Sequence, residues 1–134
     1  MNRSIKIFFL TAFAALFLTG CNAAVNFNGK VAGISSGRFL YQDGHLTSNY
    51  AEDLDSVWKA CEKTVSDLKA SGVQKARKIA SGTIEATIED EKVTIKVEYV
   101  EKNVTAVSVL VGMVGNHMAS RLIHEKILHH LKTP

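Results

Sequence analysis

Two neighbouring segments in the middle of the chain alternate strictly between apolar and polar residues. Residues 82–90 (GTIEATIED) place Ile or Ala at every second position, and residues 92–100 (KVTIKVEYV) do the same with Val, Ile and Tyr. Successive side chains of a β-strand point to opposite faces, so this period of two predicts a sheet with one apolar and one solvated face. Asp90-Glu91 is the predicted link between the two strands.

Two segments with a helical period can cover the apolar face. Residues 53–70 and 116–132 carry apolar side chains at spacings of three and four. Asp53 and Asn116 are predicted to cap the two helix starts, and Gly72 to take the left-handed conformation after the first helix. The predicted buried stripes are Leu54, Val57, Trp58, Cys61, Val65 and Leu68 in the first helix, and Ala119, Leu122, Ile123, Ile127 and Leu131 in the second.

Three further segments complete the predicted sheet. Asp43-Gly44 within residues 38–50 is typical of a type I′ hairpin turn, because both positions tolerate a positive φ. Residues 73–81 predict a basic edge strand, and residues 104–113 predict a uniformly apolar central strand. For residues 37–134 we therefore expect a single α+β domain, with an antiparallel sheet of about 5–6 strands and two amphipathic helices, including a long C-terminal helix, on one face.

The N-terminus has the pattern of an export signal. Two basic residues among the first six precede residues 7–18, an uncharged run of 12 residues. This run is shorter than the roughly 20 residues of a membrane span, and it fits the apolar part of a secretory signal peptide. We expect a signal peptide at residues 1–20, cleaved between Gly20 and Cys21, and an uncleaved anchor is the alternative.

The motif Leu18-Thr19-Gly20-Cys21 resembles a bacterial lipobox. The resemblance implies that the Cys21 thiol receives a diacylglyceryl group, that the chain is cut before it, and that the new amine is acylated. Three acyl chains, at about 0.8 kcal/mol per buried methylene, would make the attachment to the membrane permanent. Asn22 rather than Asp follows the cysteine, which implies the outer membrane, on its periplasmic face or at the cell surface. An ordinary signal peptide with a chance cysteine is the alternative.

The chain that remains after cleavage begins with a predicted tether and is nearly neutral. Residues 21–36 hold small residues and glycines without periodicity, and a strand through Val31–Ile34 is the alternative. Once Arg3 and Lys6 leave with the signal peptide, 14 of the 16 basic residues remain against 13 acidic ones. This balance gives no electrostatic case for a nucleic-acid partner.

Several segments beyond the signal peptide carry a resemblance to known proteins. They are Asp43-Gly44-His45-Leu46 with Tyr50, Leu54-Asp55-Ser56-Val57-Trp58, Gly82-Thr83-Ile84-Glu85-Ala86, Val107-Ser108-Val109 with Gly112, and Ser120-Arg121-Leu122-Ile123. With them, the chain resembles a family of short, uncharacterised bacterial lipoproteins over nearly all of residues 37–132. More narrowly, it resembles a virulence-associated surface lipoprotein of Francisella whose fold is related to that of the birch-pollen allergen (Bet v). The resemblance implies a curved antiparallel sheet that holds a long C-terminal helix over a cavity, which is smaller or partly closed here because the chain is short.

The five histidines lack the spacing of a helical metal pair. His45 lies in the predicted hairpin, while the histidines of the second helix, His117, His124, His129 and His130, follow one another at spacings of 7, 5 and 1. Two ligands on one helix face need a spacing of three or four. We therefore expect these side chains to be solvated or at the helix edges, with no metal ion and no cofactor.

The serines and the second cysteine lack the setting of a catalytic nucleophile. Ser35-Ser36 and Ser120 stand outside a G-x-S-x-G elbow, and Cys61 lies on the apolar stripe, where a thiolate is disfavoured. With Cys21 acylated, Cys61 has no disulfide partner and is expected to be a small buried side chain. We expect the protein not to be an enzyme.

Two sets of residues are candidates for binding. Lys75, Arg77 and Lys78 are candidates for contact with phosphate or anionic lipid, with a solvated edge strand as the alternative. An apolar set is the candidate lining of a ligand cavity, with ordinary core as the alternative: Trp58, Val97, Tyr99, Val109, Met118 and Leu122.

Together these features predict a lipid-anchored, non-catalytic envelope protein. It would be held in the membrane by its acyl and diacylglycerol chains, and would act through contacts with an envelope protein or other envelope components, in a role connected with virulence. The alternative is a small carrier of a lipid or another hydrophobic ligand, with its cavity between the sheet and the C-terminal helix.

Overall fold

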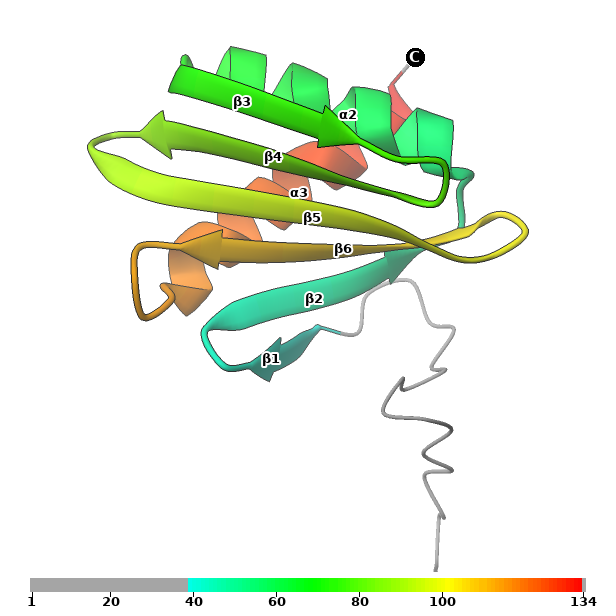
Figure 1. The fold of residues 1–134 in the computed structure, drawn as a ribbon. Helices are drawn as coiled ribbons and strands as arrows, with labels where there is room; N and C mark the ends of the chain where they lie inside the picture. Colours follow the sequence, from blue (N-terminus) through cyan, green and yellow to red (C-terminus); the bar gives the residue numbers. More distant parts are fainter. Residues whose placement is uncertain (1–38, 134) are drawn as a thin grey trace, which may run out of the picture. The chain divides into compact units, whose positions relative to one another are not determined.

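The structure is a computed structural model that describes residues 39–133, which form six strands and two helices (Figure 1). The predicted signal peptide, the acylated Cys21 and the tether lie outside the described residues. The elements follow one another as β1 (Leu40–Gln42), β2 (His45–Tyr50), α2 (Leu54–Asp67), β3 (Ser71–Arg77), β4 (Ser81–Ile88), β5 (Glu91–Glu101), β6 (Val104–Val111) and α3 (His117–Lys132).

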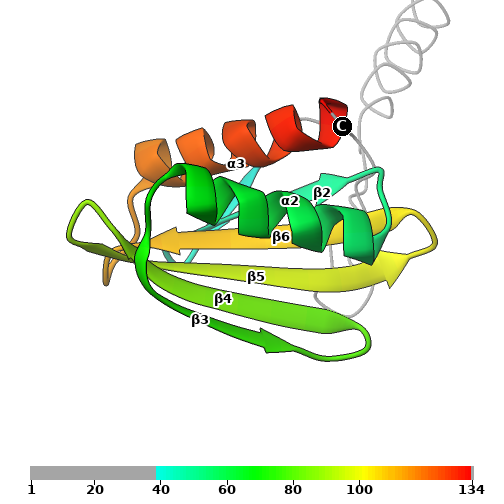
Figure 2. The ribbon, with the colours of Figure 1, turned by 90° about the horizontal axis from the view of Figure 1, so that it is seen from above.

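All six strands belong to one antiparallel sheet in the order β1-β2-β6-β5-β4-β3. Both helices lie side by side on the same face of this sheet, as Figure 2 shows from above. Helix α2 packs on β4 and β5, while α3 packs on β2 and β6. The predicted α+β architecture, with two helices on one face and a long helix at the C-terminus, is therefore confirmed.

The strand register explains why one face of the sheet is dry. Leu46 pairs with Val109, Val109 with Ile95, and Ile95 with Ile84, so these four side chains form a row across four strands. None of the four is more than 1% exposed. Their neighbours along the strands are polar except for Leu110, and they point to the uncovered face, as the alternating pattern predicted.

The structure confirms the position of one predicted tight turn and shifts the other by one residue. Asp43 and Gly44 have φ values of 51° and 79°, which confirms the predicted hairpin turn between β1 and β2. Between β4 and β5 the positive φ values belong to Glu89 (49°) and Asp90 (66°), because Ile88 pairs directly with Glu91. The link is therefore Glu89-Asp90, and the prediction of Asp90-Glu91 is wrong by one position.

Both predicted helix caps are present, but the first helix ends in a different way. Asp53 accepts a hydrogen bond of 2.9 Å from the backbone N–H of Ser56, and Asn116 accepts one of 3.1 Å from that of Ala119. The left-handed residue after α2 is Lys69, with φ 52°, and not the predicted Gly72. Gly72 also has a positive φ, of 58°, but it lies inside β3.

Two apolar residues predicted to face inward, Tyr99 and Leu122, are exposed instead. Val97 is the last buried residue on the inner face of β5, and Tyr99, two residues further along the strand, is 50% exposed. On α3 the buried residues are Ser120, Ile123, His124 and Ile127, whereas Leu122 is 53% exposed. Helix α3 therefore buries Ile123 and Ile127 of its predicted stripe, and it also turns a serine and a histidine toward the sheet.

Candidate functional site

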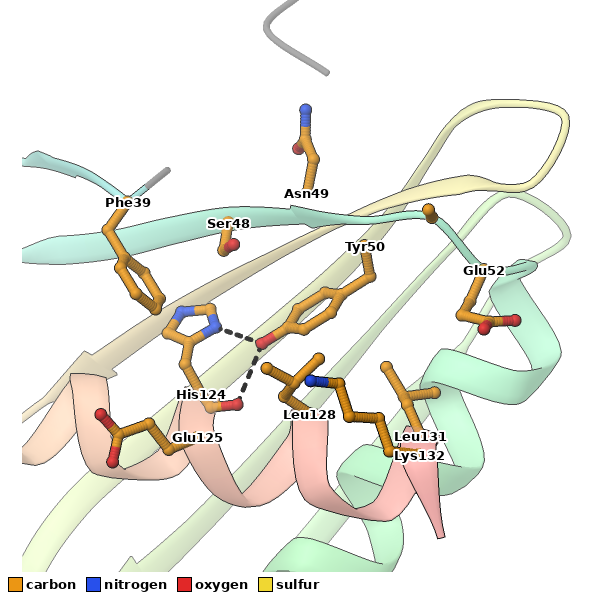
Figure 3. A pocket seen from close by; sticks show the side chains of 11 residues that line it. Phe39, Ser48, Asn49, Tyr50, Glu52, His124, Glu125, Leu128, Leu131 and Lys132 are labelled. Carbon is orange, nitrogen blue, oxygen red and sulfur yellow. Dashed lines mark hydrogen bonds between the residues drawn. The ribbon is translucent and has the colours of Figure 1, made fainter. Parts of the chain in front are cut away.

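A pocket of about 340 Å³ opens between β2 and the C-terminal half of α3 (Figure 3). Its apolar wall consists of Phe39, Tyr50, Leu128 and Leu131. The remaining lining residues are Ser48, Asn49, Ala51, Glu52, His124, Glu125 and Lys132. An apolar wall with a few polar groups is the usual composition of a site for a small ligand.

Tyr50 and His124 meet at the inner end of this pocket. The Tyr50 hydroxyl lies 2.8 Å from Nδ1 of His124, and Nε2 of the same ring lies 2.7 Å from the carbonyl oxygen of Leu46. Because a carbonyl oxygen can only accept, Nε2 carries the proton and Nδ1 accepts the hydrogen bond from Tyr50. The same hydroxyl also lies 3.2 Å from the backbone oxygen of His124.

Aromatic contacts surround the His124 ring on two sides. The ring of Phe39 meets it edge-on at a centroid distance of 5.2 Å, and the ring of Tyr50 is stacked with it at 6.0 Å. The guanidinium of Arg121 lies 5.8 Å from the centre of the Phe39 ring and so covers its outer face. His124 is consequently only 1% exposed.

Burial fixes the protonation states of the titratable groups in and below the pocket. Desolvation lowers the pKa of His124 to about 4, so its imidazole is neutral at pH 7. Desolvation also raises the pKa of Tyr50 above its ordinary value, with a smaller contribution from Cys61. The pKa of the Cys61 thiol rises to about 12, mainly through burial and secondarily through the charge of Glu62. At neutral pH the imidazole of His124, the phenol of Tyr50 and the thiol of Cys61 are therefore all uncharged.

Ser120 adds a buried polar atom to this region. Its hydroxyl is on the inner face of α3, one turn before His124, and Ser120 is fully buried. Among the described residues, its Oγ is the buried side-chain atom without a hydrogen-bond partner. Ser120 also lies outside a G-x-S-x-G motif, and within residues 39–133 no base is hydrogen-bonded to its hydroxyl.

The six residues predicted to line a cavity do not come together in this pocket. Trp58, Val97 and Val109 are buried in the core, at 9%, 0% and 0% exposure. The other three, Tyr99, Met118 and Leu122, are on the surface. The pocket does lie between the sheet and α3, but none of the six lines it, and the first three are ordinary core, which was the alternative.

Two of the three cations predicted as candidates for an anionic contact pair with carboxylates of α2. Lys75 pairs with Glu62 at 2.9 Å, and Arg77 pairs with Asp55 at 2.6 Å, so α2 carboxylates neutralise both. Arg77 also lies over the Trp58 ring, 5.1 Å from its centre. Lys78 follows β3, and its backbone N–H donates to the carbonyl of Ser81. The cations of β3 therefore hold an edge strand against α2.

The structure corrects the prediction for one histidine. His124 was expected at a solvated position and is instead buried. Within residues 39–133, no three His, Cys, Asp or Glu side chains are close enough together to hold a metal ion. In the same part of the chain, neither helix has the length and hydropathy that crossing a bilayer requires.

Comparison with known sequences and structures places the chain in a family. The model of a family described as "Protein of unknown function (DUF3568)" matches residues 4–130. The chain belongs to the DUF3568 family. Its matched range includes β2 and all but the last residues of α3, and so most of the pocket.

Other comparisons add little to the DUF3568 match. No curated protein matches the chain. Among solved structures, the vertebrate conserved region of human METTL16 is similar at 19% sequence identity and a TM-score of 0.47, covering 65% of this chain and 81% of that one. A likeness this weak carries no argument about function.

Proposed function

We propose that this DUF3568 protein is a lipoprotein anchored in the bacterial outer membrane, whose folded domain acts by binding envelope components and not by catalysis. The observation that carries the proposal is the motif Leu18-Thr19-Gly20-Cys21 at the end of a signal-peptide pattern. Acyl chains on Cys21 would hold the domain at the membrane surface, where its partners would be envelope proteins or lipids.

The state of the reactive side chains supports binding over catalysis. A nucleophile needs a neighbouring base or a lowered pKa, and burial instead raises the pKa of Cys61 to about 12. His124, a natural general base by residue type, has both ring nitrogens engaged and a pKa lowered to about 4. These groups act in packing and orientation, which suits an interaction domain.

Flotation of membranes tests the anchor. The full chain is expressed in a bacterium that processes lipoproteins, and its membranes are floated in a density gradient after a wash with high salt. We expect the wild type to float with the outer membrane and the matched variant Cys21→Ser to remain in the soluble or unprocessed fraction. Equal flotation of both as chains of the processed length would contradict the proposal.

A second candidate function is the transport or storage of a small hydrophobic ligand, which is favoured by the pocket of about 340 Å³. Pockets that bind small ligands begin at roughly this size. Native mass spectrometry of protein purified from its host would reveal a ligand that co-purifies. Leu128→Trp, which fills the pocket, should abolish that ligand, whereas Leu122→Trp on the outside of the same helix should keep it. Absence of ligand from the wild type would remove this candidate.

A further inference from the structure

Four large apolar side chains protrude from the loop that precedes α3 and from the first turns of that helix. Their exposed fractions are 96% for Met113, 87% for Val114, 74% for Met118 and 53% for Leu122. We call these four residues the apolar ridge. Met118 and Leu122 are four residues apart in α3 and so share one helix face. Contiguous exposed apolar surface of this kind marks a contact with a protein or a membrane.

Backbone contacts fix the ridge in position. Gly115, with φ 93°, and Gly44, with φ 79°, approach so closely that a Cβ on either would collide with the backbone of the other loop. The β6–α3 loop is thus locked against the β1–β2 turn, at the end of the sheet where Figure 1 shows both. The β1–β2 turn therefore holds in place the loop from which the ridge protrudes.

The ridge lies beside the point where the described chain begins. Tyr41 of β1 contacts His117 ring to ring at 5.2 Å, next to Met118 in the helix. Phe39 lies under Arg121, next to Leu122. Phe39 and Tyr41 are themselves 36% and 46% exposed. The chain that leads to Cys21 therefore enters the domain alongside the apolar ridge.

We propose that the apolar ridge rests on the lipid bilayer to which the protein is anchored, an inference that depends on the proposed function. Cys21 and Phe39 are 18 positions apart, a length that reaches about 60 Å when extended, so the tether lets the ridge reach the bilayer. A tether of this length holds the ridge at an effective concentration on the order of mM. Weak insertion of a few apolar side chains is then sufficient to orient the domain.

The charges around the ridge indicate that the contact is apolar rather than electrostatic. The Glu91 carboxylate lies beside Gly112, the residue before Met113. Arg121 precedes Leu122 in α3 and pairs with Glu125 at 3.3 Å. Charges of both signs thus flank the ridge, and zwitterionic lipid should serve as well as anionic lipid. The flexible thioethers of two methionines suit the irregular surface of a bilayer.

This orientation would leave the pocket accessible. Met118 and Leu131 are 13 positions apart in α3, which corresponds to about 20 Å along the helix axis. With the ridge on the membrane, the pocket near the C-terminal end of α3 would face away from the bilayer or along it. The domain would then present Tyr50, Leu128 and Leu131, the part of the pocket away from Phe39, to partners or ligands in the aqueous phase.

Fluorescence quenching by brominated lipid tests the proposal. Full-length lipidated protein is reconstituted in vesicles of phosphatidylcholine with brominated acyl chains, and quenching is measured against vesicles of unbrominated phosphatidylcholine. Met118→Trp should lose most of its added emission, whereas Glu98→Trp, on the uncovered face of the sheet, should lose little. Trp58, 9% exposed in the core, supplies a background that is not quenched. Equal, weak quenching of both added tryptophans would overturn the proposal.

Methionine oxidation gives a second test without any substitution. Met113 and Met118 should form sulfoxide several-fold more slowly in the reconstituted protein than in Cys21→Ser protein free in solution. Two results would overturn the proposal. In one, the methionines oxidise equally fast in both states. In the other, they are equally protected in both states, which would mean that the protein's own chain or a second copy covers the ridge. Flotation of the vesicles separates the two failures. Protein that floats without protection keeps its anchor but not the ridge contact, and protein that does not float overturns both.

Discussion

The hydroxyl of Tyr50 donates a hydrogen bond of 2.8 Å to Nδ1 of His124, although 74 positions separate the two residues in the chain. This contact joins the last residue of β2 to the middle of α3, and the Nε2 of the same ring continues it to the carbonyl of Leu46. The inner wall of the pocket is therefore a small buried network, and each of its polar atoms has a partner.

Removal of the Tyr50 hydroxyl should destabilise the domain. Tyr50→Phe keeps the ring but leaves Nδ1 of His124 buried without a donor, which costs about 1–3 kcal/mol of unfolding free energy. Urea unfolding of the two proteins measures the difference. Tyr41→Phe, at a 46% exposed position, is the matched control and should change the stability little. Equal stability of Tyr50→Phe and wild type would contradict the network.

Acid should weaken the fold through His124. The folded pKa is about 4 and the unfolded value is 6.5, so the unfolded chain takes up a proton that the folded chain excludes. The stability that neutral His124 contributes is complete above pH 6.5 and is lost as the pH falls toward 4. The loss of unfolding free energy is about 2 kcal/mol by pH 5. Urea midpoints at pH 7.5 and pH 5 measure the loss.

The control for this pH dependence is His124→Gln, whose amide can still donate to the Leu46 carbonyl but does not titrate. The variant should be less stable than wild type at pH 7.5 and should lose less stability on acidification. An identical pH dependence in both proteins would show that other groups cause the acid sensitivity.

Local patterns in the sequence predicted most of the fold. The alternation around Ile84 and Ile95 sets the two faces of the sheet, and Asp53 and Asn116 mark two helix starts by hydrogen bonds that span only three residues. Asp43-Gly44 marks the first hairpin turn, because both residues adopt a positive φ. Each of these signals acts between close neighbours in the chain, so the sequence alone reveals it.

The candidate site depends on contacts that no local pattern contains. The face of α3 that meets the sheet includes Ser120 and His124, while the apolar Met118 and Leu122 face outward. The predicted stripe was correct for Ile123 and Ile127, which are in the core, and wrong for Leu122, because hydrophobicity alone gave no reason to bury Ser120 and His124 instead. For the contact between Tyr50 and His124, the sequence held one signal. The period of two in β2 places Leu46, Ser48 and Tyr50 on the same inner face. Nothing in the sequence identifies His124 as the partner of Tyr50.

Glycine should be favoured at the C-terminal end of α2. Lys69 has φ 52°, its N–H donates to the carbonyl of Ser66, and the next N–H, of Ala70, donates to Val65, which is a Schellman motif. Lys69→Gly should therefore stabilise the domain by about 0.4–1 kcal/mol in thermal or urea unfolding. Lys63→Gly, at an exposed position inside the same helix, should instead destabilise it by about 1 kcal/mol. Destabilisation by both variants would contradict the cap.

Gly82 should not tolerate a larger residue. A Cβ at this position of β4 would collide with the six-membered ring of Trp58. Gly82→Ala should cost about 1–3 kcal/mol by overpacking and should alter the near-ultraviolet circular dichroism of Trp58. Ser81→Ala, one residue earlier, should leave that spectrum unchanged. An unaltered spectrum and stability for Gly82→Ala would refute the packing of Trp58 on this glycine.

The intact mass of the protein purified from its own host tests the central claim, which is that Cys21 carries lipid. The account predicts a chain that begins at Cys21 and is heavier than the polypeptide by a diacylglyceryl group and, on the amine, an acyl group. A free thiol at Cys21, or a chain that still carries residues 1–20, would contradict it.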